Sequence, residues 1–171
     1  LNINGTYAST LESVLTKILK NSDAELAKYL PCGSADKITD SCIIAFVTSF
    51  GDKAFRRPLD AVEVARYVQV YNSIKTNFTP SEALASTAEA ILRSPYTHFR
   101  SELGVADGSD KGSVKLSALE LATALAFSVT NSSPDVELIK AAESGALTMP
   151  GGIETQVRRL MATEPFVLSY T

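Results

Sequence analysis

The fold class is decided by one stretch, Thr79-Pro80-Ser81-Glu82-Ala83-Leu84-Ala85-Ser86-Thr87-Ala88-Glu89-Ala90-Ile91-Leu92. The hydroxyl of Thr79 can cap a helix while Glu82 reaches back to the cap amide, and Pro80 favours the first helical position. Apolar and small residues then recur at helical intervals, at Leu84, Thr87, Ala88, Ile91 and Leu92. The stretch therefore predicts a helix that begins at a defined residue.

The same start signal recurs along the chain. A capping residue stands three positions before a glutamate at Ser9–Glu12, Ser22–Glu25, Asp60–Glu63 and Ser117–Glu120. Ser133-Pro134-Asp135 repeats the proline-containing start. Helical spacing of apolar residues follows these starts, and no period-two alternation bounded by turn residues predicts strands. We predict an all-α fold, a bundle of about six to eight helices.

A polar, Gly-rich stretch at 104–112 is a candidate boundary between two lobes. It would separate an N-terminal helical lobe, 1–103, from the start of a second helical domain, 113–171. The sequence begins with Leu1 rather than Met and stops at an apolar segment, 164–171. We therefore expect the chain to be a piece of a longer polypeptide, with the second domain continuing in another segment or chain.

Composition and charge narrow the possible functions. Sixteen basic and 19 acidic residues give a formal net charge of -3, which argues against a nucleic-acid binder that works by bulk positive charge. Apolar residues make up 45% of the chain, enough for a substantial core. The longest apolar run, 42–47, is far shorter than the roughly 18 residues of a membrane span.

Cys32 and Cys42 are the chain's two cysteines, and they lie close together in the sequence. Cys32 follows Pro31 in a predicted loop, and Cys42 lies near the start of an apolar helix. The sequence favours a disulfide between them, which would indicate an oxidising, extracytoplasmic compartment. The alternative is a pair of free, buried thiols. Two cysteines and one distant histidine do not predict a metal site, and no Cys-x-x-Cys-His motif for covalent c-type haem occurs.

Four further segments carry a family resemblance. They are Lys53-Ala54-Phe55-Arg56-Arg57-Pro58-Leu59-Asp60, the stretch 90–104 with Ser94-Pro95-Tyr96, the stretch 115–122, and Gln156-Val157-Arg158-Arg159-Leu160-Met161. Together they resemble the planctomycete-type PSD domains of unknown function, and the resemblance extends from about Cys32 to Phe166. This chain departs from the family at Thr97-His98-Phe99, where an aromatic-rich sequence is typical, and lacks a tryptophan near Phe127.

Such domains occur in large secreted bacterial proteins that usually also carry cytochrome c modules. The resemblance therefore implies a periplasmic, cell-surface or secreted location and a haem-bearing partner module. The net charge and the short apolar runs predict no nucleic-acid partner and no membrane span. We expect a non-catalytic structural and interaction module. Two alternatives stay open: part of a haem-dependent oxidoreductase whose haem is bound outside this chain, and a self-assembling surface or filament subunit.

Five residues stand out as candidate site residues. Arg57 precedes a proline and is biased to an extended backbone, in which its side chain and that of Arg56 would point to opposite sides. Arg100 and Glu102 are candidate partners for this junction, which is either a structural brace or a docking site. His98 is a weak candidate for a general base or for a haem ligand offered to another module, and a packed histidine is the alternative.

Overall fold

The computed structural model describes residues 9, 10, 12–15, 17, 30, 32, 38–105 and 114–163. Helices dominate these residues, and the β structure among them is one isolated bridge, so the prediction of an all-α fold is confirmed. The chain divides into two compact units, Leu1–His98 and Phe99–Thr171. The helix start expected at Ser22, most of the Gly-rich stretch and the segment 164–171 lie outside the described residues.

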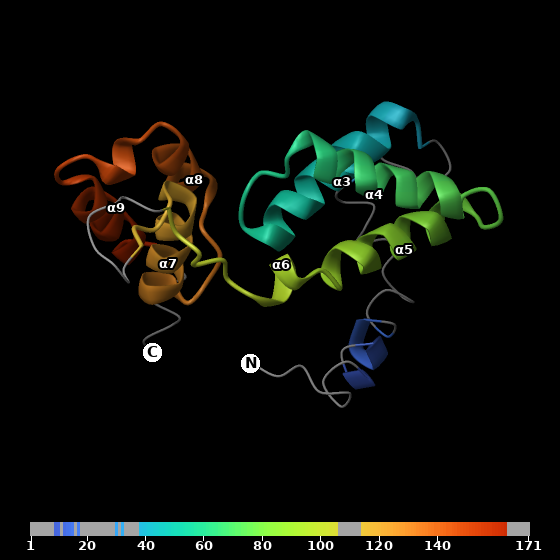
Figure 1. Cartoon of the computed structure of the whole chain (residues 1–171), viewed down its shortest axis with the longest axis horizontal. Helices are drawn as coiled ribbons and strands as arrows, with labels where there is room; N and C mark the ends of the chain where they lie inside the picture. Colours follow the sequence, from blue (N-terminus) through green and yellow to red (C-terminus); the bar gives the residue numbers. More distant parts are fainter. Residues whose placement is uncertain are drawn as a thin grey trace. The chain divides into compact units, whose positions relative to one another are not determined.

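The first unit includes three long helices and a short one, which are labelled in Figure 1. They are α3 (Asp40–Phe55), α4 (Ala61–Ile74), α5 (Pro80–Leu92) and α6 (Pro95–His98). The three long helices pack against one another in every pairing, and α6 contacts α3 and α5. Their shared core consists of Leu15, Leu30, Cys42, Ile43, Phe46, Val47, Tyr71, Ala83, Leu84 and Ala88. Two residues from the N-terminal part of the chain are thus buried with the helices.

In the residues of the second unit that the structure describes, there are three helices and one 3₁₀ turn. They are α7 (Ala118–Thr130), α8 (Val136–Glu143), η2 (Ala146–Thr148) and α9 (Gly152–Met161). Helix α7 packs against the other three elements, and the core they share is Ala122, Ala126, Leu138, Ala141, Ala142, Leu147 and Leu160. Gly152 begins α9 without a side chain because a Cβ there would collide with the carbonyl oxygen of Ala146.

The predicted capping boxes begin three of these helices. Asp60 caps α4, Thr79 caps α5 with Pro80 at the first position, and Ser117 caps α7, each with its glutamate reaching back to the cap amide. Helix α8 differs from the prediction, because Asp135 is its N-cap and the helix begins at Val136 rather than at the preceding proline. The Asp135 carboxylate accepts the amide of Leu138, so the aspartate displaces the serine as the capping residue.

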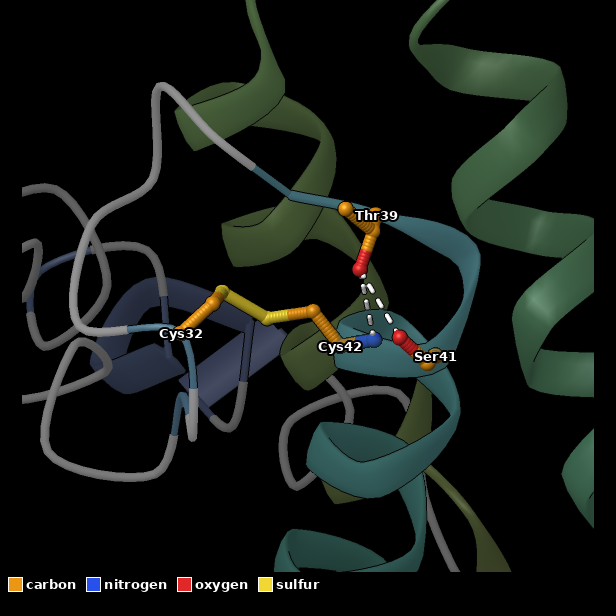
Figure 2. The surroundings of a disulfide bond; sticks show 4 residues. All are labelled: Cys32, Thr39, Ser41 and Cys42. Carbon is orange, nitrogen blue, oxygen red and sulfur yellow. Dashed lines mark hydrogen bonds between the residues drawn. A yellow bond between two sulfur atoms is a disulfide. The ribbon is translucent and has the colours of Figure 1, made fainter.

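A disulfide joins Cys32 to Cys42, as the sequence favoured, and its Cα atoms are 6.0 Å apart (Figure 2). Cys42 lies in the first turn of α3, where its amide donates to the hydroxyl of the N-cap residue Thr39 at 3.2 Å. Cys42 is buried in the core of the first unit, and Cys32 is half-buried against the same core. The bond therefore ties the chain before α3 to the start of that helix.

Removing this bond should destabilise the first unit. A disulfide that closes a ring of this length stabilises a fold by about 2–3 kcal/mol, mainly by restricting the unfolded chain. We expect reduction of the wild-type protein, or the double replacement Cys32→Ser/Cys42→Ser, to lower the free energy of unfolding by that amount in urea titrations. The double variant is the control, because reductant should leave its stability unchanged. Two alkylatable thiols in denatured, unreduced protein would contradict the assignment.

Candidate functional site

The segment between α3 and α4 holds the arginine-containing signature in place. Helix α3 ends at Arg56, which adopts the left-handed conformation with φ 59°, and Pro58 follows two positions later. Leu59 then folds back onto α3: its amide donates to Asp52 Oδ1 at 2.7 Å. The Leu59 side chain packs against Gly51. A Cβ atom added at Gly51 would lie only 2.7 Å from the Leu59 side chain. Local backbone geometry and one buried glycine thus fix this turn.

Arg57 forms a two-point ion pair with Glu63 of α4. Its two terminal nitrogens donate to the two carboxylate oxygens at 2.8 and 2.7 Å. The guanidinium also lies over the rings of Tyr96 and Phe55, at 4.9 and 5.5 Å from the ring centroids. Glu63 is buried, and the hydrogen bond from Arg57 lowers the pKa of its carboxyl. The same carboxylate accepts the amide of Asp60, so one side chain caps α4 and binds the arginine.

Arg56 has a different set of partners. Its guanidinium donates to the carbonyl oxygens of Tyr96 and Thr97 at 2.7 and 3.0 Å, and so binds the end of α6. The sequence suggested that the two arginines point to opposite sides of an extended segment. The left-handed backbone at Arg56 replaces that arrangement, and both guanidinium groups are bound within the first unit.

The other candidate residues lie near the end of the first unit and the start of the second. His98 is half-buried at the last position of α6. Arg100 is exposed and lies over the ring of Phe127 at 5.2 Å from its centroid, and Glu102 is exposed. A docking role for Arg100 and Glu102, and a cofactor-facing role for His98, stay predictions.

Glu120 of α7 is a site residue that the sequence marked only as part of a capping box. Its carboxylate accepts hydrogen bonds from the amides of Leu103, Gly104 and Ser117, at 2.8, 3.2 and 2.9 Å, and from the hydroxyl of Ser101 at 3.1 Å. Burial raises the pKa of this carboxyl, but the donors of Ser117, Gly104 and Ser101 outweigh it and lower the pKa to about 2. Glu120 therefore holds the segment before α7 against the start of that helix.

A second carboxylate, that of Asp135, has a similar role at α8. Asp135 caps the helix and binds Arg159 of α9 through both oxygens, at 2.6 and 2.9 Å. The hydrogen bond from Arg159 lowers the pKa of the Asp135 carboxyl. This pair joins the start of α8 to the last turns of α9.

A surface depression of about 620 Å³ lies beside α9. Its apolar lining consists of Leu147, Met149, Ile153, Val157 and Met161. The charged residues Glu154 and Arg158 also line it. Met149, Ile153 and Met161 are 66, 44 and 47% exposed. Among the described residues, no three His, Cys, Asp or Glu side chains gather as a metal site would require. Neither Ile153 nor Met161 was among the candidate site residues predicted from the sequence.

Two family models match the chain. Residues 42–102 match PSD5, described as a protein of unknown function (DUF1595), and cover α3 to α6. Residues 116–167 match PSD4, described as a protein of unknown function (DUF1592), and cover α7 to α9. No curated protein and no solved structure matches the chain. The resemblance that the sequence motifs predicted is confirmed.

The Arg57–Glu63 pair can be tested by a substitution that keeps the charge. Arg57→Lys loses the planar fork that binds both carboxylate oxygens and the stacking on Tyr96. We expect it to lower the free energy of unfolding of the first unit by about 1–3 kcal/mol in urea titrations. Arg66→Lys, an exposed position of α4, is the matched control and should leave stability unchanged. Equal stability of the two variants would show that the two-point pair contributes nothing.

The low pKa of Glu120 predicts a pH dependence of the second unit. A carboxyl whose folded pKa lies below its ordinary value stabilises the fold above that ordinary value, and this contribution is lost as the pH falls. For Glu120 the window extends from pH 4.5 down to about 2. We expect Glu120→Gln to be less stable than wild type at pH 7 and to lose less stability across that window, measured by circular dichroism in urea. Glu102→Gln is the control, and the prediction fails if both variants follow the wild-type curve.

Proposed function

We propose that the chain is a non-catalytic structural and interaction module of a secreted, multi-domain protein. Two PSD-type family models of unknown function match it, over residues 42–102 and 116–167. In this proposal the apolar depression beside α9 is the surface on which another polypeptide segment or chain docks. The multi-domain protein that contains this module is associated, in this proposal, with cytochrome c modules. The cytochrome c part of the proposal is supported by the family resemblance of the sequence motifs.

The exposed apolar wall of α9 is the observation that carries the proposal. Met149, Ile153 and Met161 keep between 44 and 66% of their surface open to solvent around one hollow. Solvent-exposed apolar side chains that gather at one hollow favour an interaction site, whereas scattered ones need no explanation. The hollow is lined mainly by apolar side chains, and the ion pair of Glu154 and Arg158 stands at its wall.

Three charged side chains have a structural role in their own units. Arg57, Glu120 and Asp135 each bind two or more groups of their own unit. Each of them holds a helix terminus against a neighbouring segment. Their arrangement supports a role for these residues in maintaining the scaffold.

The disulfide supports the proposed location. Structural disulfides persist in oxidising compartments, such as the periplasm, the cell surface and the extracellular medium. Among the described residues, no helix has both the length and the apolar character to cross a membrane. We therefore propose an extracytoplasmic location.

A contribution to a haem-dependent oxidoreductase is the second proposed role, with the haem in a partner module and its redox chemistry supplied there. In that role the same depression would bind the haem-bearing module. His98, which lies in the other unit, stays a separate candidate for a haem ligand. A self-assembling subunit is the third. The three roles share one docking surface and differ in what occupies it.

Site-specific photo-cross-linking tests the docking surface. A benzophenone amino acid in place of Ile153 should cross-link the full chain, in its native assembly, to one defined peptide, because the partner covers that wall. The same amino acid in place of Lys140, an exposed residue of α8, is the control and should give no defined product. Mass spectrometry identifies the peptide, and haem absorbance of the product shows whether the partner carries cytochrome c. The proposal is overturned if Ile153 and Lys140 behave alike.

A further inference from the structure

Helix α9 has a wider apolar face than the described residues of its own unit bury. Successive residues of a helix are separated by 100°, which places Leu160, Ile153, Val157 and Met161 in that order across an arc of about 100°. Leu160, at one edge of the arc, is buried in the core of the second unit. Ile153 and Met161 remain 44 and 47% exposed, so the other part of the arc faces the depression.

The two edges of this arc are used differently. On the edge beside Leu160, Arg159 binds Asp135 and Gln156 and is three-quarters covered. On the edge beside Met161, Glu154 and Arg158 form an exposed ion pair at 2.8 Å, with 67 and 77% of their side chains open to solvent. The open apolar wall is thus bordered by one acidic and one basic group, one helical turn apart.

The Glu154–Arg158 edge of one α9 helix is complementary in charge to the same edge of a second, antiparallel copy. When two identical helices pack antiparallel around a two-fold axis, the same edge of each helix comes together, and residues equidistant from the axis face each other. With the axis near Gln156, Glu154 of one copy faces Arg158 of the other, and the reverse pair forms as well. The apolar arcs then meet along Ile153, Val157 and Met161.

We propose that the occupant of the α9 surface is a second copy of this chain, docked antiparallel along α9 with two reciprocal Glu154–Arg158 ion pairs. The inference rests on the proposed function and names the partner of the same surface. A parallel arrangement would bring the Glu154–Arg158 edge against the edge where Arg159 is already bound to Asp135. The antiparallel arrangement is the one that brings Glu154 of each copy against Arg158 of the other.

The contact is small. A few side chains from each copy bury much less than the ~1,600 Å² of a standard protein interface, so we expect weak association, with a dissociation constant on the order of 10–100 µM. Met149 and Met161 suit such a contact because the flexible thioether side chain adapts to an irregular surface. We therefore expect a reversible dimer in the isolated chain, favoured where several copies are held close together.

A charge exchange tests this arrangement. In Glu154→Arg both copies carry only basic groups at this edge, and in Arg158→Glu both carry only acidic groups. Each variant alone should associate at least about tenfold more weakly than wild type, and an equimolar mixture should recover the wild-type affinity to within about threefold. Sedimentation velocity between about 10 and 500 µM, a range set by the expected affinity, gives the dissociation constants.

The mixture separates docking from folding. Neither variant regains the ion pair within its own helix, so recovery in the mixture can come only from pairs between copies. Circular dichroism checks that both variants stay folded, as expected for an exposed pair of this kind. Met161→Glu should abolish association, and Val136→Glu, at an exposed apolar position of α8, is the matched control.

Three results overturn the inference: a wild-type chain that is monomeric over the whole range, single variants that associate like wild type, or a mixture no tighter than its components. A monomeric chain whose Ile153 cross-links to a different polypeptide overturns self-docking and leaves the proposed function in place. A monomeric chain without a defined cross-link at Ile153 overturns both.

Discussion

The fold depends on carboxylates at helix N-termini that each bind a second partner. Glu63 completes the cap of α4 and binds Arg57, Glu120 completes the cap of α7 and binds the segment before it, and Asp135 caps α8 and binds Arg159. A helix N-terminus already favours negative charge, because its free amides and the helix dipole point toward it. Each carboxylate therefore stays ionised while it holds a neighbouring segment.

Local signals explain why much of this architecture could be predicted. A capping box involves residues three positions apart, so Asp60, Thr79 and Ser117 indicated the starts of three helices from sequence alone. The second role of each glutamate depends on what folds against it, and the capping pattern carries no information about that. For the same reason the sequence marked Glu63 as a cap but did not identify it as the partner of Arg57. The left-handed turn at Arg56 was not predicted, because Pro58 restricts the backbone of Arg57, the residue directly before it, and not the backbone of Arg56.

Helical periodicity likewise predicts local structure but not tertiary contacts. It correctly indicates that Val157, Leu160 and Met161 share one side of a helix, but it does not indicate which element covers that side. In the second unit the other helices reach Leu160 and leave Met161 about half exposed. An amphipathic helix whose apolar face is wider than its buried contact has surface left for another partner. The candidate site thus appears only when the burial of each residue is known.

These observations together separate the residues that maintain the scaffold from those available for recognition. Arg57, Glu63 and Glu120 are bound within their own units. Replacing one of them is therefore expected to change the stability of the helix junction that it holds. The wall formed by Met149, Ile153 and Met161 contributes little to the core and can change without loss of the fold. A module built in this way can keep one scaffold while its partner changes through substitutions on α9. In the proposed docking, apolar contact would supply the affinity, and the exposed pair of Glu154 and Arg158 would determine the orientation of the partner.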